Sequence, residues 1–425
     1  MTDILVADDS LYEDLYDVRR EAEQAGNLIE RDMNPDMCAL RDKAAVHKGF
    51  LRDLLKLPPH QRHAAAVGRP GYTSFSWTAC EAAFRDHQRF SSLIMHHPGS
   101  PDQRLSFLEM DEPEHLAYRS TIQPMFLKGK TLTWWRQNWI NDIVTSLVSN
   151  LKRGDRAELN LQLCARVPVH TITRAVGLQG DEALVFRTAL VKSGAHGRMP
   201  EEEVREAIAV VDSILDKLIA KRRMEPGDDI ISGLIAAKLK LRGEERPLTA
   251  HEVLTITKLV MLAGGGTSWR QMGITLWALM TNLDQFEAVK ADRQLIDHAI
   301  EESVRWNPTD PVFSRLVLSD TELAGVSLPA GSVLEICLGA ANRDPSRWDN
   351  PDVYDLHRPR KAHMGFGMGS HLCLGRDVAR SEINVAINAL LDAFPNIRLD
   401  PSRPAPFLTG GLEQRGVSGL PVLLR

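Results

Sequence analysis

His363–Arg380 reads HMGFGMGSHLCLGRDVAR, and the rest of the chain can be understood around this stretch. Glycines crowd around Cys373, and from residue 379 to 394 apolar residues recur every three or four positions, as on one face of a helix. A glycine-rich loop therefore delivers one cysteine to the start of an amphipathic helix. The free N–H groups there favour a thiolate, and glycine permits close backbone approach. A free cysteine is often only a small buried hydrophobe, but that reading gives the glycines no purpose.

The stretch resembles the heme-binding signature of the cytochrome P450 family, Phe-x-x-Gly-x-His-x-Cys-x-Gly, with every fixed position present. The resemblance implies that Cys373 is the axial thiolate ligand of the iron of a heme b. It also implies a set of cofactor-binding residues in this loop, namely Phe366, Gly367, His371, Cys373 and Gly375.

Composition sets broad limits on the class of protein. The 425 residues carry a formal charge of −5, with a pI near 6.3 and no long basic tract, so nucleic acid is not an expected partner. No apolar run reaches the roughly 18 residues of a membrane span, and the acidic N-terminus is unlike a signal peptide. The five cysteines are scattered, without a C-x-x-C pair. These features predict a soluble, cytoplasmic protein without a disulfide framework or a zinc site.

A second landmark is a long helix predicted from Thr249 to about Asn282. Thr249-Ala-His-Glu252 is a capping box, and thirty helical residues span about 50 Å. Three successive glycines in its middle, Gly264–Gly266, cost about 2–3 kcal/mol relative to alanine. We therefore expect close approach to a flat ligand and a local widening of the helix. A phosphate-binding loop is rejected, because the glycine spacing is wrong and no strand precedes it.

This run is similar to the oxygen-binding segment of the same family, Ala/Gly-Gly-x-Asp/Glu-Thr. Ala263, Gly264 and Thr267 match it, whereas Gly266 stands where the acid is expected. The resemblance implies that Thr267 and Cys373 are the catalytic residues and that Ala263 and Gly264 line the cofactor. Without the acid, either water held by Thr267 and Ser268 completes the proton route, or another side chain serves, or the chemistry is unusual.

Cationic side chains are predicted to hold the heme propionates. His115 and Arg119, spaced i, i+4, share a helix face, and Arg315 lies on the strand-like run FSRLVLSD. Alone, such a pair usually faces water. The resemblance assigns His115, Arg119, Arg315 and His371 to the propionates.

Glu302 and Arg305, spaced i, i+3, would by themselves be an ordinary surface salt bridge worth about 0–1 kcal/mol. With Arg358 they match a structural triad of the family, whose role is to pin the cysteine loop behind the heme.

The predicted fold is mainly α with small β-sheets (α+β), the cytochrome P450 fold with a long central helix over the heme. Short strands are expected at 70–79, 322–338 and 396–425. A single domain is expected to cover 1–425, with a helical N-terminal arm at 1–69 and a heme-binding core at 70–425.

The resemblance implies a monooxygenase that inserts one oxygen atom of O2 into a hydrophobic small molecule, such as a terpenoid, steroid, fatty acid or aromatic compound. Expected pocket walls are residues 92–108, 263–267, 312–313 and 408–412. Electrons would come from NAD(P)H through a ferredoxin and its reductase, which meet Arg376 and Arg380 unless these arginines simply face water. Two alternatives stay open: a peroxide-driven or non-oxygenating heme-thiolate enzyme, and a heme sensor, although the sequence has no evident output domain.

Overall fold

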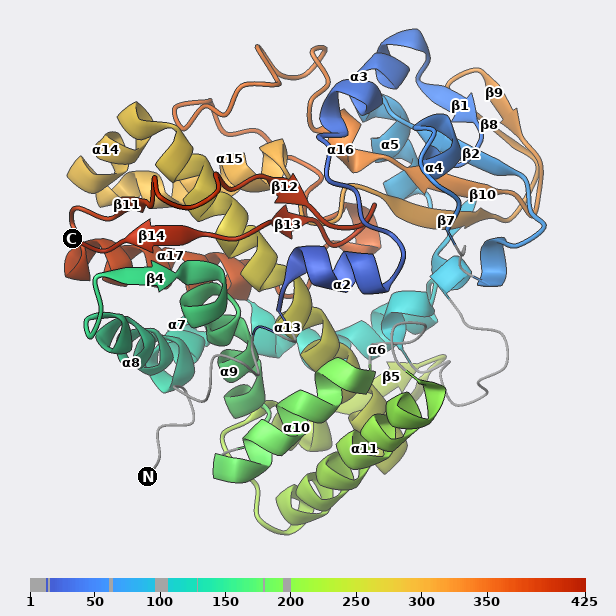
Figure 1. The fold of residues 1–425 in the computed structure, drawn as a ribbon. Helices are drawn as coiled ribbons and strands as arrows, with labels where there is room; N and C mark the ends of the chain where they lie inside the picture. The colour runs from blue at the N-terminus through green and yellow to red at the C-terminus, as the bar shows by residue number, and fades with distance from the viewer. Residues whose placement is uncertain are drawn as a thin grey trace.

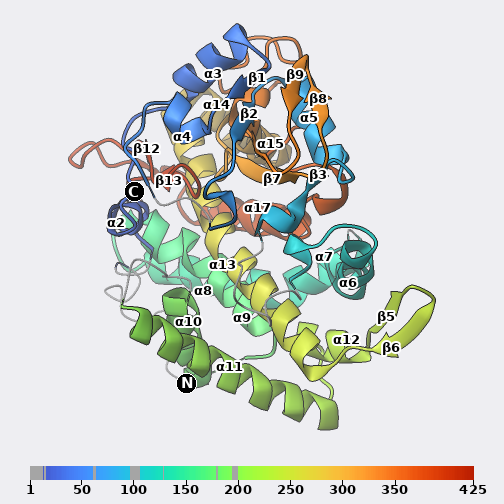
Figure 2. The ribbon, with the colours of Figure 1, turned by 90° about the vertical axis from the view of Figure 1, so that its right-hand side faces the viewer.

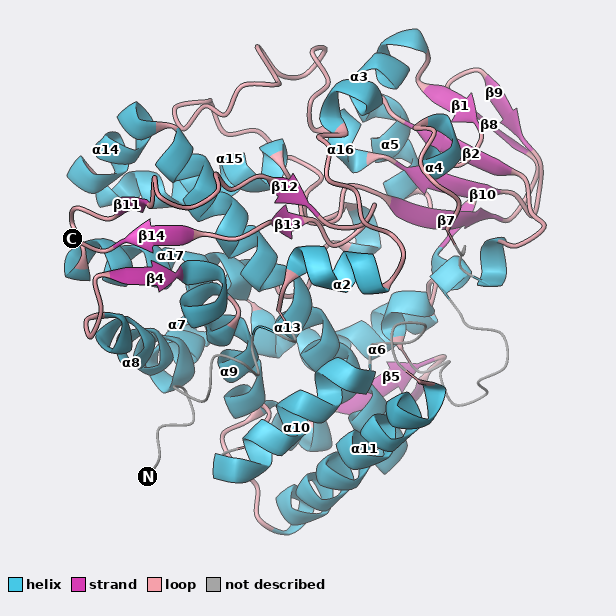
Figure 3. Ribbon diagram, in the orientation of Figure 1, coloured by secondary structure: helices cyan, strands magenta, loops and turns pink. Residues whose placement is uncertain are grey.

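Helix α13 (Ala250–Thr281) crosses the middle of the molecule, and the other elements lie around it (Figure 1 and Figure 2). The structure is a computed structural model that describes residues 13, 16–60, 64–95, 106–127, 129–178, 180–193 and 200–425. Helices make up most of the fold, and the strands of the largest sheet gather at one side (Figure 3). The prediction of a mainly helical protein with small sheets and a long central helix is confirmed.

The helices lie between Val18 and Ala393. In order they are α2 (Val18–Gln24), α3 (Asn34–Lys43), α4 (Leu51–Leu54), α5 (Trp77–Arg85), α6 (Glu114–Ile122), α7 (Lys130–Trp135), α8 (Asn141–Leu151), α9 (Arg166–Ala175), α10 (Gly180–Ser193), α11 (Glu201–Met224), α12 (Ile230–Ala236), α13, α14 (Leu283–Ala291), α15 (Ile296–Trp306), α16 (Leu338–Ala341) and α17 (Arg376–Ala393). Two short π-helical segments, Arg136–Ile140 and Asn160–Cys164, lead into α8 and α9.

Five strands form the largest sheet, in the order β1-β2-β10-β7-β3. Only β2 and β10 run parallel. These strands are β1 (Val46–Lys48), β2 (Gly71–Ser74), β3 (Phe90–Ser91), β7 (Phe313–Val317) and β10 (Val333–Ile336). Smaller sheets join β4 (Arg156–Glu158) with β11 (Arg398–Leu399) and β14 (Pro421–Leu423), β5 (Lys238–Leu241) with β6 (Glu244–Pro247), β8 (Thr321–Leu323) with β9 (Val326–Leu328), and β12 (Leu408–Thr409) with β13 (Gly416–Val417). The largest sheet positions Arg315, which lies opposite Leu334 in the register of β7 and β10.

The capping box predicted for α13 is present. Thr249 Oγ1 accepts the Glu252 N–H at 3.2 Å, and Glu252 Oε2 accepts the Thr249 N–H at 2.7 Å. The predicted local widening is wrong, because α13 continues through its glycines without interruption. Packing explains the difference. A Cβ on Gly264 would lie 3.3 Å from Ile172 Cγ1, so the missing side chain allows α9 to pack closely against α13 and does not widen the helix.

The N-terminal arm packs into the rest of the fold. Strand β1 extends the largest sheet, which the expectation of a purely helical arm did not include. Helix α2 lies against α13, where Glu21 forms an ion pair with the buried Arg270. The Tyr16 and Trp269 rings also meet edge to face, 5.8 Å apart. The arm therefore braces the central helix close to its glycines.

Candidate active site

The loop before α17 holds Cys373 in a tight backbone turn. The Cys373 N–H donates to the Phe366 carbonyl at 2.9 Å and closes the loop. Gly369 has a φ of +72°, and a Cβ there would lie 2.4 Å from the Phe84 carbonyl oxygen. Gly367, with a φ of +70°, also needs the left-handed region that favours glycine. The glycines predicted to serve this cysteine therefore shape the loop that presents it.

Cys373 is the exposed cysteine among the described residues; the other four are buried. Its thiol nevertheless experiences strong burial, which raises its pKa, so it faces an enclosed space rather than the outer surface. The N–H groups of Gly375 and Arg376 and the charges of Arg119 and Arg376 act in the opposite direction and lower that pKa. The N–H groups at the start of α17 thus lower the pKa of Cys373 as predicted, but burial raises it by more. A metal ion is the usual partner that converts such a thiol to a thiolate.

Four cationic or potentially cationic side chains gather beside this loop, and they are the four predicted to hold propionates. His115 and Arg119 come from α6, Arg315 from β7, and His371 from the loop itself. The His115 and His371 rings lie 3.9 Å apart. Arg119 Nη2 donates to the Leu372 carbonyl at 2.5 Å, which ties the cluster to the cysteine loop. The structure therefore brings these residues together from distant parts of the chain.

The electrostatics of this cluster fit the binding of an anionic group. Burial lowers the pKa of His371 to about 3, with help from His115, Arg315 and Arg119. Burial also lowers the pKa of Arg315 to about 10, opposed only by Asp111. The Nε2 atoms of both histidines are buried without a hydrogen-bond partner. Because buried cations are costly without a counter-charge, the cluster fits a group that carries carboxylates. Heme has two such carboxylates, so these residues fit the cofactor.

Helix α13 presents exposed apolar residues beside its glycines. Leu262 is 46% exposed and Ala263 is exposed, although the helix crosses the middle of the molecule. Thr267 Oγ1 donates to the Ala263 carbonyl at 3.2 Å. The Gly266 carbonyl accepts a hydrogen bond from Arg270 Nη1 at 2.5 Å. The charged group at this turn of α13 is therefore a guanidinium and not a carboxylate. The predicted distal residues thus line open space, but without the acid.

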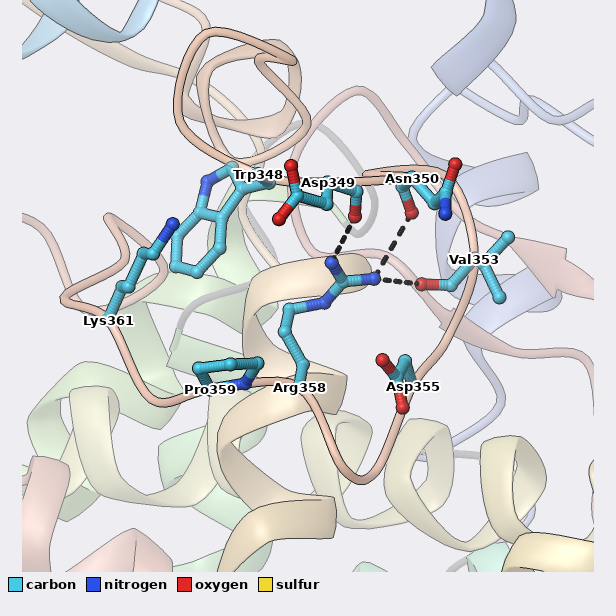
Figure 4. Close-up of a pocket in the computed structure, with 8 residues that line it drawn as sticks. All are labelled: Trp348, Asp349, Asn350, Val353, Asp355, Arg358, Pro359 and Lys361. Carbon is cyan, nitrogen blue, oxygen red and sulfur yellow. Dashed lines mark hydrogen bonds between the residues drawn. The ribbon is translucent and has the colours of Figure 1, made fainter.

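The triad forms as predicted, and it is buried rather than superficial. Arg305 makes a two-pronged contact with Glu302, with both distances 2.7 Å, and Arg358 Nε reaches Glu302 Oε1 at 3.0 Å. Both arginines also donate to backbone carbonyls of residues 342–353. Figure 4 shows Arg358 in this role, beside a cavity of about 290 Å³ lined by residues 348–361. This cavity includes no residue of the cysteine loop.

Sequence reasoning missed the carboxylate that ties the cysteine stretch to α15. Glu301 accepts Arg380 Nε at 2.6 Å and Nη2 at 2.8 Å, and it lies 3.3 Å from His363 Nε2. Despite burial, these two partners lower the pKa of Glu301 to about 2. Arg380 also pairs with Asp377, and its side chain keeps 26% exposure. Only the tertiary pairing of α15 with α17 reveals this contact.

The residues expected to form the pocket walls differ in their exposure. Phe313 and Leu408 of the expected walls are partly exposed, whereas Val312 and Leu412 are buried in a core cluster with Phe75. Their apolar character is used in packing instead. Within the 92–108 wall, residues 96–105 lie outside the described part of the chain.

Comparisons with known proteins agree with this geometry. The profile of the family described as "Cytochrome P450" matches residues 185–410. The chain is 34% identical to cytochrome P450 105C1 of a Streptomyces species, over 91% of this chain and 94% of that protein. It is 35% identical to 6-deoxyerythronolide B hydroxylase of Saccharopolyspora erythraea, over 74% and 76%. The crystal structure of CYP109E1 from Bacillus megaterium in complex with testosterone superposes with a TM-score of 0.80 at 23% identity, covering 93% and 100%.

The fold and the relatives define the class of the protein as a heme-dependent oxygenase of bacterial type. The chain belongs to the cytochrome P450 family, and it is an enzyme of the monooxygenase kind. Within the described residues, no helix combines the length and apolarity needed to cross a membrane.

Proposed function

We propose that this chain is a heme-thiolate monooxygenase that inserts one oxygen atom of O2 into a hydrophobic small molecule by hydroxylation or O-dealkylation. In this proposal Cys373 is the axial ligand of heme b, and residues 1–425 act as a single domain. One observation carries the proposal: an exposed yet enclosed cysteine adjoins a buried cationic cluster whose histidine Nε2 atoms have no partner.

Each group has a defined task in this proposal. Cys373 holds the iron, and the loop carbonyl of Phe366 fixes the position of the cysteine backbone. His115, Arg119, Arg315 and His371 bind and neutralise the cofactor carboxylates. When bound, the heme supplies the oxygen-activating chemistry, because a thiolate ligand favours O–O cleavage.

Substrate and oxygen are proposed to meet on the α13 side of the cofactor space. The exposed Leu262 and Ala263 offer apolar contact there. The Thr267 hydroxyl is the polar group proposed to handle protons. The relative from Saccharopolyspora erythraea is named as a hydroxylase of 6-deoxyerythronolide B, which supports hydroxylation as the reaction. Terpenoids, steroids, fatty acids and aromatic compounds are the candidate substrate classes.

The overall reaction consumes the substrate RH, O2, two electrons and two protons, and it releases ROH and water. We propose that NAD(P)H supplies the electrons through a ferredoxin and its reductase. Arg376 is the partly exposed cation next to Cys373, since its Nη1 donates to the Cys373 carbonyl at 3.1 Å. An acidic partner that docks there approaches the cysteine side of the cofactor.

Gly266 favours one alternative, the direct use of hydrogen peroxide, because it stands where the family motif has an acid. The test compares two oxygen sources with one product assay. Incubation with ¹⁸O2, NAD(P)H, ferredoxin and reductase should place ¹⁸O in the product. Product that forms only with peroxide, and carries ¹⁸O only from labelled peroxide, would support the alternative and refute the O2-dependent function.

A further inference from the structure

A carboxylate just before α6 orients one histidine of the cationic cluster. Glu112 Oε1 lies 3.0 Å from His115 Nδ1, and Glu112 Oε2 accepts the Leu116 N–H at 2.9 Å. The Glu112 side chain keeps 22% exposure, whereas the His115 side chain keeps 1%. The backbone N–H therefore holds the carboxylate in place, and the carboxylate holds the imidazole ring.

This contact decides which nitrogen of His115 carries the hydrogen. An ionised carboxylate only accepts hydrogen bonds, so His115 Nδ1 must donate to Glu112. In the neutral ring Nε2 is then an acceptor, and it is buried without a hydrogen-bond partner. Burial lowers the pKa of His115 although Glu112 acts against this effect, so the ring is neutral at pH 7 in the heme-free protein. An ionised cofactor carboxylate, which also only accepts, cannot pair with Nε2 of the neutral ring.

Among the described residues, the charges near His115 already balance one another. Two guanidiniums and two carboxylates surround the ring, namely Arg119 on α6, Arg315 on β7, and Asp111 and Glu112 before α6. His371 is neutral, because burial lowers its pKa to about 3, and Arg376 pairs with Asp377 at 3.7 Å. The two carboxylates of heme therefore bring more negative charge than these groups neutralise. Because buried charge without compensation is costly, an added proton favours the bound state.

We propose that His115 takes up a proton when the cofactor binds, and that Glu112 is the positioning residue that stabilises the resulting imidazolium. This inference rests on the proposed function. The proton comes from solvent and binds at Nε2, so the ring donates from Nδ1 to Glu112 and from Nε2 to a heme carboxylate. A cation between two carboxylates stays charged well above the ordinary histidine pKa of about 6.5. Heme is then retained while the ring is charged and released faster once the ring loses this proton.

Nitrogen NMR of the ring tests its charge directly. The ¹⁵N-histidine-labelled enzyme is loaded with heme and measured in its diamagnetic ferrous carbon monoxide form, and the His115 signals are those lost from His115→Gln. At pH 7 both ring nitrogens should have the chemical shifts of an imidazolium. In the heme-free protein they should have those of a neutral ring protonated at Nδ1. A neutral His115 in the heme-loaded enzyme would overturn the proposal.

A matched pair of variants tests the role of Glu112. Glu112→Gln keeps the shape of the side chain but removes its charge, whereas Glu114→Gln removes the same charge two residues later, where the carboxylate pairs with the exposed Arg242. A neighbouring opposite charge shifts a pKa by about 1–3 units, so heme transfer from Glu112→Gln to a heme-free globin should accelerate at least about one pH unit lower than in wild type. At pH 8 this transfer should be about tenfold faster. Glu114→Gln should stay within about twofold of wild type.

The outcomes separate this inference from the function on which it rests. An identical pH profile of heme transfer in Glu112→Gln and wild type, or an equal shift in Glu114→Gln, would overturn the role of Glu112. If Glu112→Gln does not fold, the nitrogen spectrum of the wild-type enzyme decides the question. A wild-type enzyme without the carbon monoxide band of a thiolate-ligated heme would instead refute the proposed function.

Discussion

Removal of the Glu302 carboxylate should destabilise the protein far more than a typical surface ion pair. Glu302 is 6% exposed and Arg305 is 1% exposed, and Arg358 joins the same carboxylate. Glu302→Ala leaves two guanidiniums without their anion in the interior, which costs about 3–5 kcal/mol when a buried pair is broken. This is a large share of a total stability of about 5–15 kcal/mol. Urea denaturation followed by circular dichroism should therefore show a much lower midpoint.

The chain offers a matched control on the neighbouring helix. Glu287 and Lys290 form an ion pair with the same i, i+3 spacing, but the Glu287 side chain is 68% exposed. Glu287→Ala should change the free energy of unfolding by less than about 1 kcal/mol. If Glu302→Ala also stayed within about 1 kcal/mol of wild type, the triad would not be the buried anchor inferred from its geometry.

Three further predictions concern the cofactor cluster and the cysteine loop. Arg315→Leu should release heme faster in a heme-transfer assay, yet it should raise the stability of the heme-free protein, because an unneutralised buried cation is removed; slower release would contradict its role. His371 has a folded pKa of about 3, below the ordinary value of about 6.5 in the unfolded chain, so the unfolded state binds more protons between these values. The stability of the heme-free protein should thus fall as pH decreases from about 6.5 toward 3, and His371→Gln should flatten that slope in pH-dependent melts; an unchanged slope would be the contrary result. Gly365→Ala would place a Cβ 2.4 Å from Val304 Cγ1 and should destabilise the loop, whereas Gly375→Ala meets nothing within 4 Å and should fold normally; equal melting temperatures for the two variants would contradict this.

Local patterns in the sequence predicted the proximal half of the site well. The glycine-rich loop, the capping box and the apolar face of α17 depend on near neighbours, so spacing alone reveals them. The triad joins Glu302 to Arg358, 56 residues later, and only the family resemblance predicted that link. The convergence of α6, β7 and the cysteine loop was likewise inferred from the resemblance, since no local signal brings Arg315 near His115.

Predictions that depended on tertiary packing were less reliable. The glycines of α13 suggested a widened helix, but the structure uses Gly264 to admit Ile172 of α9. Val312, predicted as a pocket wall, packs in a core cluster with Phe75. The burial of the Glu382 carboxyl, which is 3% exposed, was also missed. One signal was available, because Glu382 lies three residues after Ala379 and four before Ala386, on the apolar face of α17. An acid on such a face indicates a buried carboxyl.

The central claim is that Cys373 provides the thiolate ligand of a heme, and one spectrum tests it most directly. The reduced wild-type protein treated with carbon monoxide should show the red-shifted Soret band of a thiolate-ligated heme. Cys373→Ala should lose that band, whereas Cys80→Ala, which changes a fully buried cysteine elsewhere, should keep it. A wild-type protein without the band, or a Cys373→Ala variant that retains it, would contradict the account.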